Sequence, residues 1–327
     1  MLENLKRILT GFKSKKIIVW GDLILDEYIY TTTGRISREA PVLVTEFDSN
    51  EYILGGAGNV VMNIHALGAV PIPVALIGTN SDGKALKGIL QKNGIDTGSL
   101  VELDDYHTPK KSRILSGGEN TKKQQVLRID TLNKTRIHPS AYERIESILA
   151  KLLETIDFLV ISDYIYKTVN PIVFNRIRER FPTKTFIIDS RQHLTEYKGV
   201  SIATPNEPEI KKLFPENNFF SQQDFFDAGI ELLERLSAGG VVLKRGHKGM
   251  IVFEKGNPPR QIDIHGSSDI VDVTGAGDTV ISVLSLALSA GAGLLSASHL
   301  ANVAAGIVVM KEGCYPIRAR ELEHELE

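Results

Sequence analysis

The segment Asp272–Thr279, with the sequence DVTGAGDT, places glycines and a carboxylate directly before a long apolar stretch. Glycines permit a tight turn, and exposed N–H groups of Gly275, Ala276 and Gly277 at a helix start would form a site for an anion such as phosphate. Asp278 would then lie where its carboxylate can accept a proton from an attacking hydroxyl. The plainer alternative is an acid that only complements the helix dipole, which is worth about 0.3–1 kcal/mol.

Two other segments carry groups suited to holding a sugar. Gly55 and Gly56 begin a glycine-dense turn ahead of a helical pattern, where a ligand can approach the main chain. Asn59, at the end of this turn, offers both a donor and an acceptor to a hydroxyl. Asp22 and Asp26 follow the first predicted strand, at the edge where open α/β sheets bind ligands. Each segment also has an ordinary interpretation, as a helix start or as surface acids.

A third segment, TPNEPE, follows another predicted strand and contains Asn206 and Glu209. Their oxygens are ligands of the type that Mg²⁺ prefers, and we expect them to act through bound waters. The same residues could instead cap a helix, with acids in its first turn.

Composition excludes several classes of protein. The chain has 38 basic and 40 acidic residues and a net charge of −2, and neither sign forms a block that could follow a nucleic-acid backbone. We therefore expect neither nucleic acid nor a membrane surface as a partner. The single cysteine, Cys314, fits a reducing compartment and is expected to be a packing residue. The N-terminus lacks the pattern of a signal peptide, so we expect a cytoplasmic protein.

The stretch from Thr279 to Met310 contains no Asp, Glu, Lys or Arg and is long enough for a membrane span. It nevertheless includes many serines, and Gly291-Ala292-Gly293 divides it. Both features favour two buried helices of an ordinary protein core.

The elements that must position these groups follow an alternating pattern. Short apolar runs at 16–20, 73–76, 158–161, 185–189 and 241–244 alternate with helical periodicity, which predicts an α/β fold with a mostly parallel sheet. Segments 27–52 and 101–131 contain strand-like stretches without helices and are expected to pair as a small antiparallel sheet. Residues 117–120 would form a turn between two of its strands.

These motifs together resemble ribokinase-type carbohydrate kinases, the phosphofructokinase-B superfamily, over nearly the whole chain. DVTGAGDT is the most specific of them. The segments GDLILDEYIY (21–30), GRISREAPV (34–42) and GGAGNVVMNIHALGA (55–69) look most similar to D-glycero-D-manno-heptose 7-phosphate kinases. The resemblance implies a three-layer α/β/α fold over 1–327 as a single kinase domain, with 27–52 and 101–131 as a lid that excludes water.

The resemblance also implies roles for the candidate residues. Asp278 would be the base, with Gly275, Ala276 and Gly277 as the anion hole. Asn206 and Glu209 would organise Mg²⁺. Nucleotide contacts would come from Asn206, Lys244, Gly246, Gly249 and Asn302. The substrate would be held by Asp22, Asp26, Gly55, Gly56 and Asn59, and its own phosphate would need a basic residue near Lys111, Arg113 or Arg191.

The implied cofactors are ATP and Mg²⁺, with a monovalent cation such as K⁺ near Asp272 as a common feature of the superfamily. The implied assembly is a homodimer formed through the lid. The first hypothesis for function is phosphorylation of the anomeric hydroxyl of D-glycero-D-manno-heptose 7-phosphate to the 1,7-bisphosphate. A kinase for another sugar, sugar phosphate or nucleoside is the alternative. A non-catalytic sugar or nucleotide binder is the third, although it would have no need of a base at Asp278.

Overall fold

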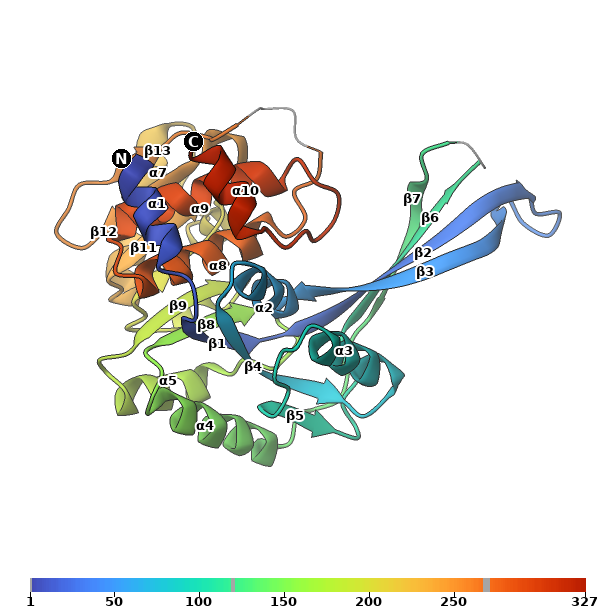
Figure 1. The fold of residues 1–327 in the computed structure, drawn as a ribbon, viewed down its shortest axis with the longest axis horizontal. Coiled ribbons are helices and arrows are strands. Elements are labelled where there is room, and N and C mark those ends of the chain that lie inside the picture. The colour runs from blue at the N-terminus through green and yellow to red at the C-terminus, as the bar shows by residue number, and fades with distance from the viewer. Residues whose placement is uncertain (1, 119–120, 267–270) are drawn as a thin grey trace.

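The computed structural model describes residues 2–118, 121–266 and 271–327 and contains two β-sheets (Figure 1). In the larger sheet the strands lie in the order β13 (Arg260–Ile262), β12 (Met250–Glu254), β11 (Gly240–Lys244), β10 (Ile202–Ala203), β9 (Thr185–Ser190), β8 (Phe158–Asp163), β1 (Lys16–Gly21), β4 (Val70–Gly78) and β5 (Leu100–Leu103). All neighbours from β11 to β5 pair in parallel, and β12 and β13 add antiparallel pairs at one edge. The expected mostly parallel sheet is confirmed.

Helices cover both faces of the larger sheet. One face carries α1 (Leu2–Thr10), α2 (Ala57–Ala66), α3 (Ser81–Lys92), α8 (Ala276–Ser289), α9 (Leu294–Val308) and α10 (Ala319–Glu325). The other face carries α4 (Pro139–Leu153), α5 (Pro171–Arg180), α6 (Glu207–Leu213) and α7 (Gln222–Leu236). Two 3₁₀ turns, Leu194–Glu196 and Gly246–Lys248, lie in connecting segments. Figure 1 shows α8 and α9 across the sheet from α4 and α5.

Strand β1 shows why the sheet is buried on both sides. Ile17 and Val19 pack into the cluster beneath α2 and α8, whereas Ile18 and Trp20 pack into the cluster beneath α4 and α5. Successive side chains of a strand point to opposite faces, so a continuous apolar run requires cover on both. This explains why the predicted parallel strands read as uninterrupted apolar sequence.

The uncharged stretch from Thr279 to Met310 forms α8 and α9, which are separated near Gly291 as expected. Gly291 has φ 87°, a left-handed conformation that glycine adopts without strain. Among the described residues, no helix is long and apolar enough to cross a membrane.

The smaller sheet, called here the small sheet, has the order β3 (Leu43–Gly56), β2 (Leu23–Ile36), β6 (Lys110–Gly117) and β7 (Gln124–Thr131) and projects from the body of the molecule (Figure 1). Its two hairpin pairs are antiparallel, as expected, but β2 and β6 pair in parallel, so the expected small antiparallel sheet is wrong only for this central pair. Residues 101–103 lie in β5 of the larger sheet, not in the small sheet. Half of the expected turn at 117–120, residues 119–120, lies outside the described residues.

Candidate active site

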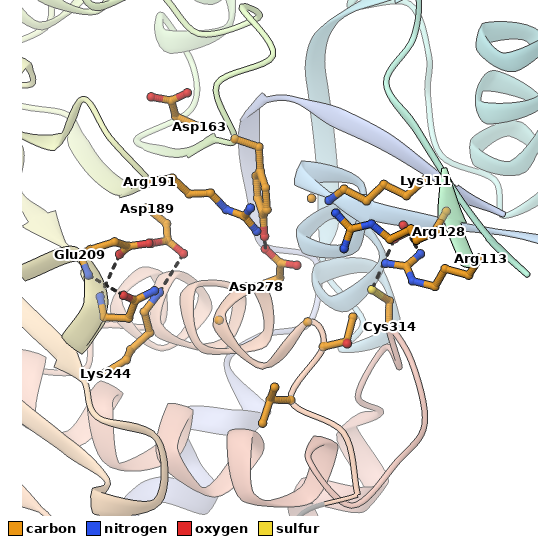
Figure 2. A pocket seen from close by; sticks show the side chains of 18 residues that line it. Lys111, Arg113, Arg128, Asp163, Asp189, Arg191, Glu209, Lys244, Asp278 and Cys314 are labelled. Atoms are coloured by element: carbon orange, nitrogen blue, oxygen red, sulfur yellow. Dashed lines mark hydrogen bonds and ion pairs between the residues drawn. The ribbon is translucent and has the colours of Figure 1, made fainter. Parts of the chain in front are cut away.

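A cavity of about 370 Å³ lies between the body of the molecule and the small sheet. The ends of β8, β9 and β11, the start of α8, and strands β2, β6 and β7 bring charged side chains to its wall (Figure 2). The residues that line it include Asp26, Lys111, Arg113, Arg128, Tyr164, Asp189, Arg191, Asn206, Glu209, Lys244, Asp278 and Cys314.

Asp278 lies in the first turn of α8, with 3% of its surface exposed, and it lines this cavity. The Tyr164 hydroxyl donates to its Oδ1 at 2.7 Å, and the Asn59 side-chain amide donates to its Oδ2 at 3.0 Å. Burial raises the pKa of Asp278 to about 6, although both donors act in the opposite direction. A carboxylate with this pKa is a stronger base than a free Asp and is still ionised at neutral pH.

The glycine turn before α8 only partly matches the predicted anion site. Gly275 has φ 80°, and Gly275 and Gly277 line the cavity. The N–H of Ala276 instead donates to the Val273 carbonyl at 3.3 Å, and Ala276 faces a neighbouring cavity. A side chain at position 275 would put its Cβ 2.5 Å from the Asn59 amide nitrogen. Glycine there lets Asn59 reach Asp278.

Asn59 was expected to hold the sugar, but the structure directs its amide to Asp278. The Asn63 amide donates to the Asn59 Oδ1 at 3.1 Å, which leaves the Asn59 NH₂ facing the carboxylate. The Ile317 N–H in turn donates to the Asn63 Oδ1. Asn59 is 1% exposed and is not among the residues that line the cavity, and its amide instead contacts the Asp278 carboxylate.

Asp22 was also expected to contact the substrate, and the structure places it elsewhere. It is fully buried, and its carboxylate accepts three bonds of 2.9 Å from the N–H groups of Tyr164, Tyr166 and Thr168. This carboxylate holds the loop after β8, in which Ile165 has φ 70°. Such a conformation costs about 1–3 kcal/mol and needs support from its surroundings. Burial, followed by repulsion from Asp163, raises the pKa of Asp22 to about 6.

Asp26 does face the cavity, from the start of the small sheet. Its Oδ1 accepts a bond of 2.6 Å from Arg113, and the Cys314 thiol lies 3.8 Å from its Oδ2. Cys314 is buried as expected, and it also forms part of the cavity wall. Gly56 lines the cavity, whereas Gly55 makes room for Asp26, because a Cβ at position 55 would lie 2.1 Å from the Asp26 Oδ2.

Cations gather on the side of the cavity formed by the small sheet. Lys111 and Arg113 come from β6 and Arg128 from β7, and Arg191 reaches in from the end of β9 (Figure 2). Arg113 pairs with Asp26, and Arg128 pairs with Asp130. Within the described ranges neither Lys111 nor Arg191 forms an ion pair. Burial lowers the pKa of Lys111; the charge of Asp26 opposes this effect, and the nearby Arg191 and Arg128 add to it.

The opposite side of the cavity carries Lys244, whose ammonium contacts the Asp189 carboxylate at 2.8 Å. Lys244 and Gly277 also line a second cavity of about 140 Å³, which is mostly apolar. Gly246, Gly249 and Asn302, to which the resemblance assigns nucleotide contacts, line this second cavity together. The Asn302 amide donates to the Asp263 carbonyl at 2.8 Å.

Asn206 and Glu209 form a capping box at the start of α6, so the plain alternative for this motif is seen in the structure. Both residues nevertheless line the main cavity beside Asp189. Burial and then the like charge of Asp189 raise the pKa of Glu209, and a cation would relieve that repulsion. The oxygens of Asn206 and Glu209 are hard donors of the type that Mg²⁺ prefers.

Residues 14–320 match the family described as pfkB family carbohydrate kinase. The chain belongs to the pfkB family of carbohydrate kinases. It is 35% identical over 319 residues to the Bifunctional protein HldE of Desulfatibacillum aliphaticivorans, and 35% identical over 319 residues to that of Pasteurella multocida. The alignments cover 97% and 96% of this chain but only 64% of each relative. The chain thus spans about two thirds of the length of these curated relatives.

Solved structures confirm the ribokinase-like fold of this member of the pfkB carbohydrate kinase family. Phosphofructokinase-2 from Escherichia coli in complex with substrates and products has a TM-score of 0.75 at 18% identity, covering 95% of this chain and 98% of that one. Arabidopsis thaliana ribokinase complexed with ribose and ATP has a TM-score of 0.71 at 17% identity, covering 96% and 99%.

Sequence reasoning about the kinase missed several residues of the site. Asp189 ends a predicted strand, and Tyr164 directly follows β8, which extends two residues beyond its predicted end; these positions were the available signal. Arg128 comes from β7, whose segment was expected in the small sheet, but the sequence did not show that this side chain faces the cavity. Asp163 also lines the cavity, but its carboxylate accepts bonds from Ser190 and Tyr197 and supports the loop.

Proposed function

We propose that this kinase transfers the γ-phosphate of ATP to the anomeric hydroxyl of D-glycero-D-manno-heptose 7-phosphate and produces the 1,7-bisphosphate. Three segments, 21–30, 34–42 and 55–69, support this substrate through their similarity to heptose 7-phosphate kinases. The catalytic part of the proposal is supported by a buried base, Asp278, beside a helix N-terminus.

The observation that carries the substrate assignment is the pair of cations without acidic partners in the described residues, Lys111 and Arg191. Both lie at the cavity that contains Asp278, and two further arginines stand beside them. Asp26 and Asp130 pair with Arg113 and Arg128, but the four cations on this side exceed these two carboxylates, and a dianionic phosphate would supply further negative charge. A sugar that already carries a phosphate fits this side of the cavity better than a neutral sugar.

In the proposed reaction, the acceptor hydroxyl lies between Asp278 and the γ-phosphate. Its oxygen forms a bond to the γ-phosphorus while the bond from that phosphorus to the β-γ bridging oxygen breaks. The hydroxyl proton passes to Asp278, and ADP leaves with the bridging oxygen. Because phosphoryl transfer has a loose transition state, positioning and charge stabilisation contribute more than proton removal.

We propose that the nucleotide base occupies the apolar cavity lined by Gly246, Gly249 and Asn302, so that the phosphates extend past Lys244 to Gly275 and Gly277. Mg²⁺, held through waters by Asn206 and Glu209, would neutralise charge on the transferring phosphates. A K⁺ ion near Asp272 remains part of the proposal, and Escherichia coli phosphofructokinase-2 has been solved with potassium. We further propose a cytoplasmic enzyme that forms homodimers through the small sheet.

The test is ADP release with ATP and Mg²⁺ across D-glycero-D-manno-heptose 7-phosphate, sedoheptulose 7-phosphate, fructose 6-phosphate, ribose and adenosine. Selective turnover of the manno-heptose phosphate supports the proposal. Turnover confined to another acceptor would retain the kinase and its base but overturn the heptose assignment. ADP release that does not depend on any acceptor would count against both the heptose assignment and the role as a sugar kinase.

A further inference from the structure

Tyr164 connects the proposed phosphate-binding cations with the base. Its hydroxyl donates to the Asp278 Oδ1 at 2.7 Å, and the guanidinium of Arg191 lies 4.1 Å from the centre of its ring. The ammonium of Lys111 lies on the same ring at 5.8 Å. The hydroxyl of Tyr164 thus contacts the proposed base, while its ring contacts the cations proposed to bind the substrate phosphate. Such a side chain can align the base with these cations.

We propose that Tyr164 is a positioning residue for phosphoryl transfer, which fixes the plane of the Asp278 carboxylate together with Asn59. The inference rests on the proposed function in that Asp278 is taken as the base. One oxygen of Asp278 accepts from Tyr164 and the other from Asn59, so the carboxylate cannot rotate without losing a bond. Each oxygen keeps a second lone pair, to which the acceptor hydroxyl can donate.

The loop after β8 is built to hold Tyr164 in this place. Asp22 binds the N–H of Tyr164 directly and those of Tyr166 and Thr168 beyond it. Ile165 and Lys167 both have positive φ, 70° and 75°, so the loop is strained on either side of Tyr166. Backbone strain of this kind persists only where surrounding contacts determine the conformation. The buried Asp22 supplies those contacts, and this gives it a function that does not involve touching a substrate.

Tyr164 also remains a donor over the working range of pH. Burial, and then the negative charges of Asp278 and Asp189, raise its pKa well above the ordinary value. A bond from a neutral hydroxyl stabilises the ionised form of Asp278, so it opposes the effect of burial on this carboxylate. The other charged groups that act on Asp278 are Asp189, which disfavours ionisation, and Lys244, which favours it.

The deciding variant is Tyr164→Phe, which keeps the ring beside Arg191 and removes only the hydroxyl. Without this donor the pKa of Asp278 should rise by about one unit, because hydrogen bonds to charged groups are the stronger class. The acid limb of kcat/KM should move to higher pH by the same amount. At the plateau, kcat should fall about tenfold through loss of alignment, with KM for ATP unchanged.

The matched control is Tyr166→Phe, two residues along the same loop, whose hydroxyl has no hydrogen bond in the described structure. Its acid limb should coincide with that of the unmodified enzyme. A merely structural role for Tyr164 would lower activity by the same factor at every pH, and equal acid limbs in Tyr164→Phe and the parent would overturn the proposal.

A second measurement separates failure of this inference from failure of the proposed function. Carbon NMR of protein labelled at the Asp carboxyls follows the titration of Asp278 without substrate, and Asp278→Asn identifies its resonance. An upward shift of the titration midpoint in Tyr164→Phe supports the positioning role whichever acceptor the enzyme uses. An unchanged midpoint overturns it even if heptose 7-phosphate proves to be the substrate.

Discussion

The two sides of the cavity around Asp278 differ in how their charges are satisfied. On the side where we propose that the nucleotide binds, Lys244 already contacts Asp189, and Asn206 and Glu209 bind each other in a capping box. On the side of the small sheet, Lys111 and Arg191 have no acidic partner in the described part of the chain. The first side is thus organised without a ligand, whereas in the proposed function the second side would gain negative charge from the phosphate of the acceptor. We infer that catalysis depends mainly on the first side and acceptor choice on the second.

Removal of the base should give the largest effect. Asp278→Asn keeps the size of the side chain but cannot take up the proton, so kcat should fall by about 10²–10⁴-fold. Nucleotide affinity, measured by calorimetry with ADP, should change little because the apolar cavity is intact. Unchanged turnover would remove Asp278 from the mechanism. Loss of nucleotide binding would show that this variant does not separate catalysis from nucleotide binding.

Charge reversal on the small sheet should act on acceptor choice. Lys111→Glu should lower kcat/KM for the phosphorylated sugar by about 10–100-fold, since a charge-assisted bond to phosphate is replaced by repulsion. KM for ATP should stay the same. Lys134→Glu makes the same change of charge at an exposed position that does not line the cavity, and it should behave as the parent. Equal losses in the two variants would contradict a phosphate site at Lys111.

The pH dependence of activity should report on the buried base itself. Burial raises the pKa of Asp278 to about 6, and the base must be ionised to accept a proton. Activity should therefore be full above this value and should fall about tenfold for each pH unit below it. The residual activity of Asp278→Asn should lack this limb. A limb near pH 4 in the parent enzyme would mean that the carboxylate is solvated during turnover.

Local features of the site and the fold could be predicted from the sequence, whereas contacts between distant segments could not. Asp278 and its glycine turn could be found because the pattern is local, and the parallel strands because buried strands read as continuous apolar runs. Asp22 and Asn59 were assigned to the substrate because residue type reveals the capacity for hydrogen bonds but not the partner. Their partners, Tyr164 and Asp278, lie 142 and 219 residues away along the chain. The parallel pairing of β2 with β6 likewise depends on contacts between distant segments.

Substitutions in the outer part of the small sheet should have the smallest effect on turnover but should change the oligomeric state. Ile36 and Phe47 are 69% and 66% exposed. Exposure of such large apolar side chains to water is unfavourable unless another surface covers them. If two copies pair through the small sheet, Phe47→Glu should shift sedimentation velocity profiles from dimer to monomer. Phe220→Glu provides the control, because Phe220 is 91% exposed but lies between α6 and α7, outside the small sheet. Dissociation in both variants, or in neither, would contradict a dimer built on the small sheet.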